Sequence, residues 1–215
     1  MIACRDIHME YRNGSLSKQV LKGVDFTINP YDRIGLLGRN GAGKSTLIRL
    51  IGGVEIPTKG KVTRKMSCSW PLGFTGGFQG SLTGYDNARF IARIYDKSYD
   101  EMRDFVEDFT ELGTNLKMPV KIYSSGMRAR LAFALSLAIE FDCYLIDEVI
   151  LVGDKNFQDK CKAEFFEKRH DRALLLASHS IDLVRQYCNR AIVLHDGRAQ
   201  VYDDVSQAIS FYNEL

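Results

Sequence analysis

The apolar positions of the chain follow two spacings, one typical of strands and one typical of helices. Short apolar runs bounded by polar residues or glycine predict strands over 2–9, 24–28, 32–37, 61–65, 143–146, 174–177, 191–194 and 198–202. Apolar residues three and four positions apart predict helices over 46–51, 87–95, 101–111, 126–140, 155–168, 181–187 and 205–212. The strongest amphipathic pattern lies at 126–140. Strands that alternate with helices indicate an α/β fold.

One long stretch departs from this alternation. Between about 84 and 140 the sequence shows helical spacing and no strand pattern. No low-complexity linker or internal repeat separates it from the rest. We therefore expect a single domain over 1–215, in which a helical lobe at about 84–140 is inserted into the α/β core.

Composition excludes several classes of protein. Hydrophobic residues make up 45% of the 215 positions and charged residues 26%, as in ordinary globular proteins. A net charge of +2 predicts no strong attraction to nucleic acid or anionic lipid. The apolar runs are too short to span a bilayer, and the first residues show no signal peptide. The five scattered cysteines favour reduced thiols in a cytosolic protein.

The main chemical signal is a glycine-rich loop between a predicted strand and a predicted helix. It matches the phosphate-loop pattern G-x-x-x-x-G-K-[ST] without a mismatch: Gly38, Arg39, Asn40, Gly41, Ala42, Gly43, Lys44, Ser45 and Thr46. Glycines let backbone N–H groups surround phosphate oxygens, and the helix adds its positive N-terminal end. We expect Lys44 to reach the β- and γ-phosphates of ATP and Ser45 to ligate Mg²⁺. A glycine-rich turn that only caps the helix is the alternative.

Two carboxylates follow the predicted strand 143–146. Ligands of open α/β sheets bind beyond the carboxyl ends of the strands. Asp147 is therefore predicted to hold Mg²⁺, and Glu148 to act as general base toward the attacking water. The alternative is a pair of acids that merely opens a loop.

A serine-glycine helix start lies between these two motifs, over 123–131, and His179 follows both. Serine alone would indicate an ordinary N-cap. The order of the four motifs, however, resembles the ATPase subunit of an ATP-binding cassette (ABC) transporter. The resemblance implies that Ser124, Ser125 and Gly126 bind the γ-phosphate held by the opposite subunit. Ser124 and Gly126 match the Leu-Ser-Gly-Gly-Gln pattern of the family, whereas Ser125 departs from it.

The same resemblance assigns roles to four further residues. His179 would hydrogen-bond the γ-phosphate and orient Glu148, although a lone histidine is usually structural. Asp154 matches the acid of the loop through which two subunits touch. Tyr11 would stack on adenine, unless it is only an aromatic residue at a strand edge. Gln79 would contact Mg²⁺, although it lies unusually close to the Leu-Thr pair that follows it.

The segment 69–84 is similar to the ATPase subunit of bacterial capsular polysaccharide exporters. The implied fold is a phosphate-loop NTPase cassette with a RecA-like core sheet, an N-terminal antiparallel β part and an inserted helical lobe. The implied partners are a membrane permease in a separate chain and, with ATP bound, a second copy of the protein. No nucleic acid partner is implied. The resemblance places the protein peripherally on the cytoplasmic face of the inner membrane, in contact with the membrane through the permease.

Three other classes are weaker alternatives. O-antigen and teichoic-acid exporter ATPases share the connector, but many carry an added C-terminal domain, whereas this sequence stops at Leu215. Cassettes that repair DNA insert a long coiled coil, and the 79 positions between Lys44 and Tyr123 are too few for one. Cassettes that act on ribosomes usually carry two copies in one chain. A regulatory cassette that binds ATP without hydrolysis would not require the full set of polar residues at Lys44, Asp147, Glu148 and His179.

Overall fold

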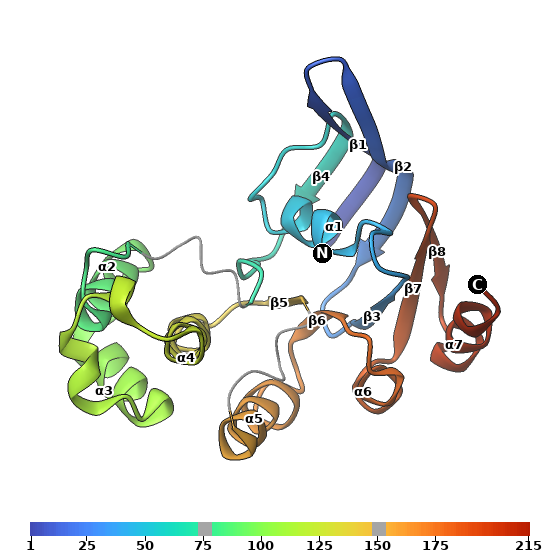
Figure 1. Cartoon of the computed structure of the whole chain (residues 1–215). Helices are drawn as coiled ribbons and strands as arrows, with labels where there is room; N and C mark the ends of the chain where they lie inside the picture. The colour runs from blue at the N-terminus through green and yellow to red at the C-terminus, as the bar shows by residue number, and fades with distance from the viewer. Residues whose placement is uncertain (73–78, 148–153) are drawn as a thin grey trace. The chain divides into compact units, whose positions relative to one another are not determined.

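The computed structural model describes residues 1–72, 79–147 and 154–215 (Figure 1). Its backbone contacts divide it into two compact parts. The α/β unit comprises 1–71, 141–147 and 170–215 of the described residues, and the helical unit comprises 72, 79–140 and 154–169. The helical unit contains the predicted lobe and also residues 154–169, which lie outside it. The single-domain organisation over 1–215 stays a prediction.

The α/β unit contains two sheets. In the antiparallel sheet, β1 (Ile2–Asn13) lies between β2 (Leu16–Ile28) and β4 (Lys59–Arg64). The second sheet has the order β5-β6-β3-β7-β8. Its strands are β3 (Arg33–Leu37), β5 (Cys143–Asp147), β6 (Ala173–Ala177), β7 (Arg190–His195) and β8 (Arg198–Tyr202). The first four pair in parallel, and only β8 is antiparallel to its neighbour. This confirms the predicted α/β class with an N-terminal antiparallel part.

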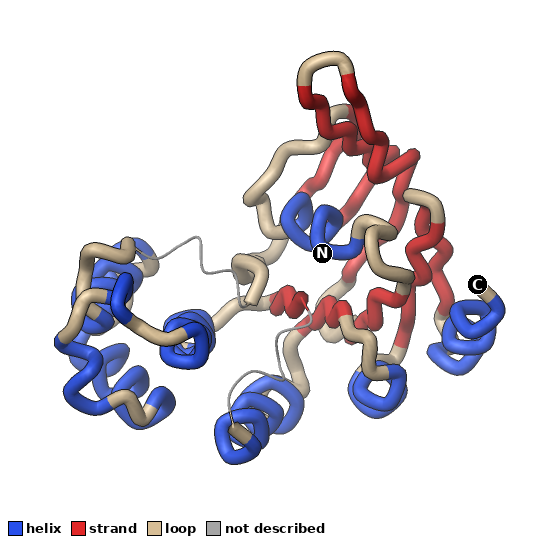
Figure 2. The backbone as a smooth tube through the Cα atoms, viewed as in Figure 1, coloured by secondary structure: helices blue, strands red, loops and turns tan. Residues whose placement is uncertain are grey.

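Helices are distributed between the two units (Figure 2). The α/β unit carries α1 (Lys44–Ile51), α6 (Ile181–Tyr187) and α7 (Val205–Glu214). The helical unit carries α2 (Gly84–Ile94), α3 (Tyr99–Thr110), α4 (Ser125–Leu137) and α5 (Lys155–Lys162). It also has two 3₁₀ helices, Gly113–Lys117 and Val120–Ile122, and a π-helical turn, Ala163–Glu167. Within the described residues, no helix is long and apolar enough to cross a bilayer.

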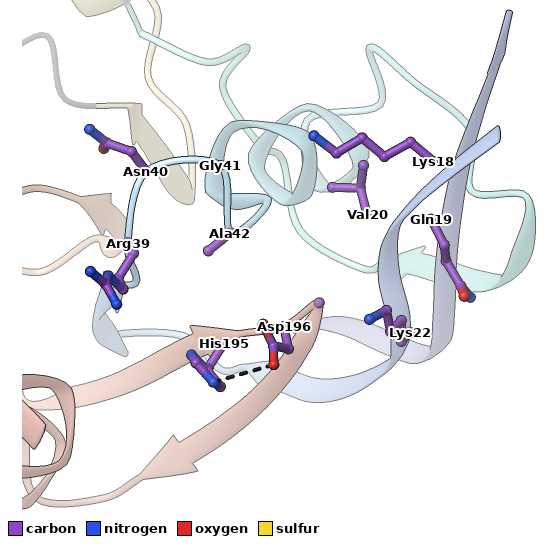
Figure 3. Close-up of a pocket in the computed structure, with 11 residues that line it drawn as sticks. Lys18, Gln19, Val20, Lys22, Arg39, Asn40, Gly41, Ala42, His195 and Asp196 are labelled. Carbon is purple, nitrogen blue, oxygen red and sulfur yellow. Dashed lines mark ion pairs between the residues drawn. The ribbon is translucent and has the colours of Figure 1, made fainter. Parts of the chain in front are cut away.

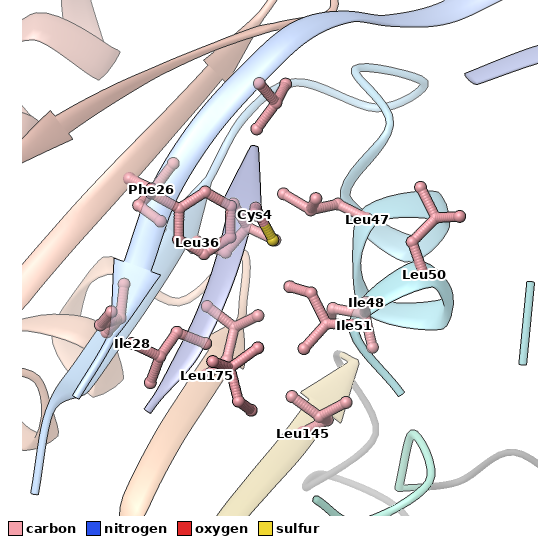
Figure 4. Packing of buried hydrophobic residues seen from close by; sticks show 14 of the residues in the cluster. Cys4, Phe26, Ile28, Leu36, Leu47, Ile48, Leu50, Ile51, Leu145 and Leu175 are labelled. Carbon is pink, nitrogen blue, oxygen red and sulfur yellow. The ribbon is translucent and has the colours of Figure 1, made fainter. Parts of the chain in front are cut away.

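The core of the α/β unit joins both sheets to α1 (Figure 4). Cys4 and Phe26 come from the antiparallel sheet, Leu36 and Leu175 from the parallel strands, and Ile48 from α1. Each of these side chains is 6% exposed or less. Burying one large apolar side chain stabilises a fold by about 1.5–3 kcal/mol, so this cluster fixes α1, and with it the loop before α1, against β3.

The five cysteines are all free: three are buried (Cys4, Cys143 and Cys161) and two are partly buried (Cys68 and Cys188). Burial raises the pKa of the Cys4 thiol to about 12. A thiol with such a pKa stays protonated at neutral pH and is a poor nucleophile. Cys4 is therefore a packing residue of the core.

The amphipathic prediction for 126–140 is wrong. Every position from 131 to 137 in α4 is buried, and the helix ends at Leu137. Phe133 packs edge-on against Phe157 and Phe165, at ring-centroid distances of 6.2 and 6.0 Å. Three polar residues of α4 have partners inside the unit: Ser136 Oγ donates to Ala132 O at 2.8 Å, Arg128 Nη1 to Tyr123 O at 2.8 Å and Arg130 Nη1 to Thr110 O at 3.1 Å. The helix is central in its unit, and its polar residues therefore do not mark a solvent face.

We predict that Gly35→Ala destabilises the protein. A Cβ at Gly35 in β3 would lie 2.3 Å from Val184 Cγ1 on α6, and overpacking of this kind typically costs about 1–3 kcal/mol. In a chain of this size the melting temperature should fall by about 2–4 °C per kcal/mol. The double variant Gly35→Ala/Val184→Ala should recover part of the loss.

The matched control is Gly80→Ala, where the nearest atom to an added Cβ is 3.6 Å away. Its thermal melt should resemble that of the wild type. A wild-type melt for Gly35→Ala would contradict the close packing of β3 against α6.

Candidate functional site

The glycine-rich loop begins where β3 ends, at the carboxyl edge of the parallel sheet. Its backbone requires glycine at two positions: Gly41 has φ 80°, and Gly43 has φ 107°. A Cβ at Gly43 would also approach Val20 Cγ1 to 3.0 Å. The helix α1 then begins at Lys44, and the N–H groups of its first turn have no acceptor inside the helix. Such a helix start binds anions, phosphate in particular.

Lys44 is buried, with 6% of its surface exposed. Its Nζ donates to Gly38 O at 2.7 Å, so the ammonium group lies against the first residue of the glycine-rich loop. A buried cation in this position provides a fixed positive charge for an anion in the loop. The geometry therefore fits the predicted contact between Lys44 and the β- and γ-phosphates.

A pocket of about 450 Å³ opens beside the loop, a volume typical of sites for small ligands. One wall comes from the β1–β2 hairpin and the other from the loop and the start of α1. The lining residues are Tyr11, Lys18, Val20, Asn40, Gly41, Gly43, Lys44, Ser45 and Thr46. The hairpin thus places the Tyr11 ring and Lys18 in the same pocket as the residues that are predicted to bind phosphate.

Asp147 and His179 lie at the same edge of the sheet as the loop. Asp147 is the last residue of β5, and His179 follows the end of β6 by two residues. Because β6 lies between β5 and β3, and all three strands are parallel, their carboxyl ends meet at one edge. The fold therefore brings these two predicted residues to the side of the sheet that carries the loop. Glu148 lies outside the described residues.

The loop also borders a second pocket, of about 380 Å³, which adjoins the first (Figure 3). Arg39 and Ala42 line this pocket and not the first. Arg39 Nη1 donates to Leu215 O at 3.1 Å. Lys22 and His195 add further basic groups, and His195 Nε2 lies 3.5 Å from Asp196 Oδ2. The predicted contact of Arg39 with nucleotide stays a prediction.

The serine-glycine motif lies in the helical unit, at the start of α4. Ser124 is the N-cap residue, and its Oγ accepts from Met127 N at 3.2 Å. Ser124 and Ser125 are exposed. A Cβ added to Gly126 would meet only Ser124 Oγ, at 3.9 Å. The capping role of Ser124 is thus present, and the exposed helix start is open to a partner; binding of γ-phosphate in trans by these three residues stays a prediction.

Gln79 is held by α2 through its backbone. Its N–H donates to Asn87 Oδ1 at 3.1 Å, and its carbonyl accepts from Asn87 Nδ2 at 3.3 Å. Asn87 is buried. In the part of the chain that the structure describes, no three His, Cys, Asp or Glu side chains are grouped to hold a metal ion. Magnesium binding by Ser45, Asp147 and Gln79 stays a prediction.

The first pocket also contains residues that are not among those predicted from the sequence. Lys18 and Val20 enter it because β2 folds back on β1, where Lys18 pairs with Tyr11. The hairpin turn at Asn13–Leu16 could have indicated this pairing. Arg49 and Glu55 form hydrogen bonds with the Tyr11 hydroxyl. Neither their spacing in the sequence nor their residue types could have predicted these bonds.

Known proteins that are similar to this chain are ATP-binding proteins, in agreement with the phosphate loop of the site. A family model described as ABC transporter matches residues 21–150. The chain is 56% identical to the ATP-binding protein BexA of Haemophilus influenzae, covering 100% of this chain and 99% of BexA. It is also 56% identical to the capsule polysaccharide export ATP-binding protein CtrD of Neisseria meningitidis, covering 100% of both. The teichoic acids export ATP-binding protein TagH of Bacillus anthracis is 33% identical, and the match covers 39% of TagH.

Solved structures share the fold. An ATP-binding subunit of an ABC transporter superposes with a TM-score of 0.79 at 23% identity, covering 99% of this chain and 94% of the other. A dimeric ATP-binding cassette bound to ADP and Pi superposes with a TM-score of 0.76 at 20% identity, covering 94% and 98%. At these identities the likeness concerns the fold alone.

We predict that Lys44→Ala abolishes hydrolysis of MgATP and weakens its binding. The variant loses the buried ammonium group at the start of α1, and charged hydrogen bonds of this kind are worth about 1.5–3 kcal/mol each. That corresponds to a loss of affinity of roughly ten- to 150-fold. Equilibrium binding and phosphate release by the purified protein would measure both effects.

Lys22→Ala is the matched control, because Lys22 lines the 380 Å³ pocket and not the 450 Å³ pocket that contains Lys44. It should bind and hydrolyse MgATP within about twofold of the wild type. Normal turnover in Lys44→Ala would refute the assignment of the loop.

Proposed function

This chain belongs to the ABC transporter family, and from that premise we propose that it is the ATP-hydrolysing subunit of an exporter that moves capsular polysaccharide across the bacterial inner membrane. The ATPase part is supported by one arrangement: a phosphate loop closed by buried Lys44, with Asp147 at the same sheet edge. The choice of polymer is supported by the similarity to BexA and CtrD along the full chain.

The described residues fit MgATP. The first-turn N–H groups of α1 and the ammonium group of Lys44 bind the β- and γ-phosphates. Ser45, at the helix start, and Asp147, at the end of β5, would supply oxygen ligands for Mg²⁺. Gln79 would be a further ligand, as the family resemblance implies. When bound, Mg²⁺ neutralises charge that develops on the phosphate oxygens.

The remaining residues act on water and on the γ-phosphate. Glu148 accepts the proton of the attacking water as general base. His179 hydrogen-bonds the γ-phosphate and orients Glu148 and the water. Tyr11, on the other wall of the pocket, stacks on adenine. These roles explain why an aromatic ring, a lysine and a hydroxyl group line one pocket.

Transport requires partners. A second copy of the chain presents Ser124, Ser125 and Gly126 to the γ-phosphate held by the first, so ATP stabilises a closed dimer and hydrolysis reopens it. The difference in stability between closed and open dimers drives a permease in a separate chain. Two copies dock on that permease at the cytoplasmic face of the inner membrane, and no nucleic acid takes part. The dimeric cassette bound to ADP and Pi has the same fold and supports this proposal.

We predict that Glu148→Gln binds MgATP normally and hydrolyses it about 10²–10⁴-fold more slowly, because it lacks the general base. The ATP-bound dimer should accumulate and be visible in sedimentation. Glu140→Gln, which removes the same charge at an exposed position, should retain wild-type turnover and remain mostly monomeric during turnover. Normal turnover in Glu148→Gln, with monomer alone, would argue against both the base and the dimer.

Export is tested in a capsule-forming bacterium that lacks its own export ATPase. We expect the wild-type chain, expressed with its permease, to restore polysaccharide at the cell surface, whereas Lys44→Ala leaves the polymer inside. Restoration of a teichoic acid or O-antigen instead of capsule would overturn the choice of polymer. Equal amounts of surface polymer with the wild-type chain and with Lys44→Ala would overturn the coupling of export to ATP hydrolysis.

A further inference from the structure

A hydrogen-bonded cluster joins the hairpin wall of the nucleotide pocket to its phosphate-loop wall. The Tyr11 hydroxyl, at the far end of β1, donates to Glu55 Oε2 at 2.5 Å. Arg49, on α1, donates from Nε to Glu55 Oε1 at 2.7 Å and from Nη2 to the Tyr11 hydroxyl at 3.3 Å. Both carboxylate oxygens of Glu55 are therefore engaged, one by the tyrosine and one by the arginine.

The cluster continues into the first turn of α1. Arg49 Nη2 also lies 3.3 Å from Thr46 Oγ1, and the Tyr11 hydroxyl lies 3.4 Å from the same atom. Thr46 is buried, and both Thr46 and Tyr11 line the 450 Å³ pocket. One network of hydrogen bonds therefore holds an aromatic ring on one wall and the start of the phosphate-binding helix on the other.

The Tyr11 ring needs such a restraint. It is 38% exposed and lies on the outer part of a hairpin whose flanking residues are mostly polar and exposed. An unrestrained ring would have to lose rotational freedom each time it packed against a ligand, which lowers the affinity about two- to twelvefold. The hydrogen bond from the Tyr11 hydroxyl to Glu55 has already removed this rotational freedom before a ligand binds. Arg49 in turn compensates the charge of Glu55, at side-chain exposures of 31% and 25%.

We propose that Glu55 and Arg49 are positioning residues that hold the Tyr11 ring in its base-stacking orientation and link the base of the nucleotide to the phosphate loop. The proposal rests on the stacking role of Tyr11 given above. In this role Glu55 determines how much the adenine base contributes to the affinity for MgATP. A purely structural role for the Arg49–Glu55 ion pair, fixing the loop after α1, would affect the base and the phosphates equally.

The experiment measures the affinity of the full-length protein for MgATP and for magnesium tripolyphosphate, which has no base. Glu55→Ala should weaken MgATP binding about two- to twelvefold and leave tripolyphosphate binding unchanged. Tyr11→Phe, which keeps the ring and loses the hydroxyl, should match it. The double variant should be no weaker than either single variant, because both remove the same restraint. Glu55→Gln keeps an acceptor and should recover most of the affinity.

Glu10→Ala is the matched control on the same strand, where Glu10 pairs with Arg12 at 3.0 Å and not with Tyr11. It should leave both affinities unchanged. Equal losses for MgATP and tripolyphosphate in Glu55→Ala, or additive losses in the double variant, would overturn the proposal.

Tyr11→Ala separates this inference from the proposed function. Loss of MgATP affinity in Tyr11→Ala without loss in Glu55→Ala would overturn positioning and leave the stacking role intact. Unchanged MgATP affinity in Tyr11→Ala would overturn stacking and positioning together, while the ATPase assignment would still stand on Lys44. Failure of the wild-type protein to bind MgATP would instead overturn the proposed function.

Discussion

The parallel pairing of β3 with β6 and β7 is the constraint on which the site depends. Backbone hydrogen bonds align Leu36 with Ala177 of β6 and Leu37 with Val193 of β7. On the far side of β6, Asp147 pairs with the same Ala177. Since these side chains other than Asp147 are almost fully buried, a change in register would expose apolar surface and is strongly disfavoured. The chain segments that follow the strands therefore start from fixed positions at one edge.

Much of this arrangement could be predicted from the sequence, because it follows from local requirements. The left-handed backbone at Gly41 and Gly43 can be met readily only by glycine, so the loop has a recognisable pattern. Short apolar runs gave the strands, and the structure extends β1 and β2 beyond them into a polar hairpin arm. At the tip of this arm, over 10–13 and 16–19, the paired strands have no buried side chain, so hydrophobic alternation could not reveal them.

Other features depend on contacts between distant residues. The bond of Tyr11 to Glu55 spans 44 positions and exists only because the hairpin folds over the end of α1. The burial of α4 could not be predicted either, since Arg130 interrupts its apolar pattern. Arg130 donates to Thr110 O at 3.1 Å and forms an ion pair with Asp154, which caps α5 through Phe157 N. These contacts join α3, α4 and α5 into one unit and hold α4, including its exposed start, in place.

MgATP binding between the hairpin and the phosphate loop, with both walls of the pocket already in place, underlies every role assigned here. A crystal structure of the protein with Mg²⁺ and a non-hydrolysable ATP analogue tests this binding mode. The β-phosphate should lie against the N–H groups at Gly43–Ser45, with adenine on the Tyr11 ring and the Tyr11 hydroxyl still bonded to Glu55. Phosphates bound on the Arg39–His195 side of the loop, or a Tyr11 ring turned away from the base, would contradict it.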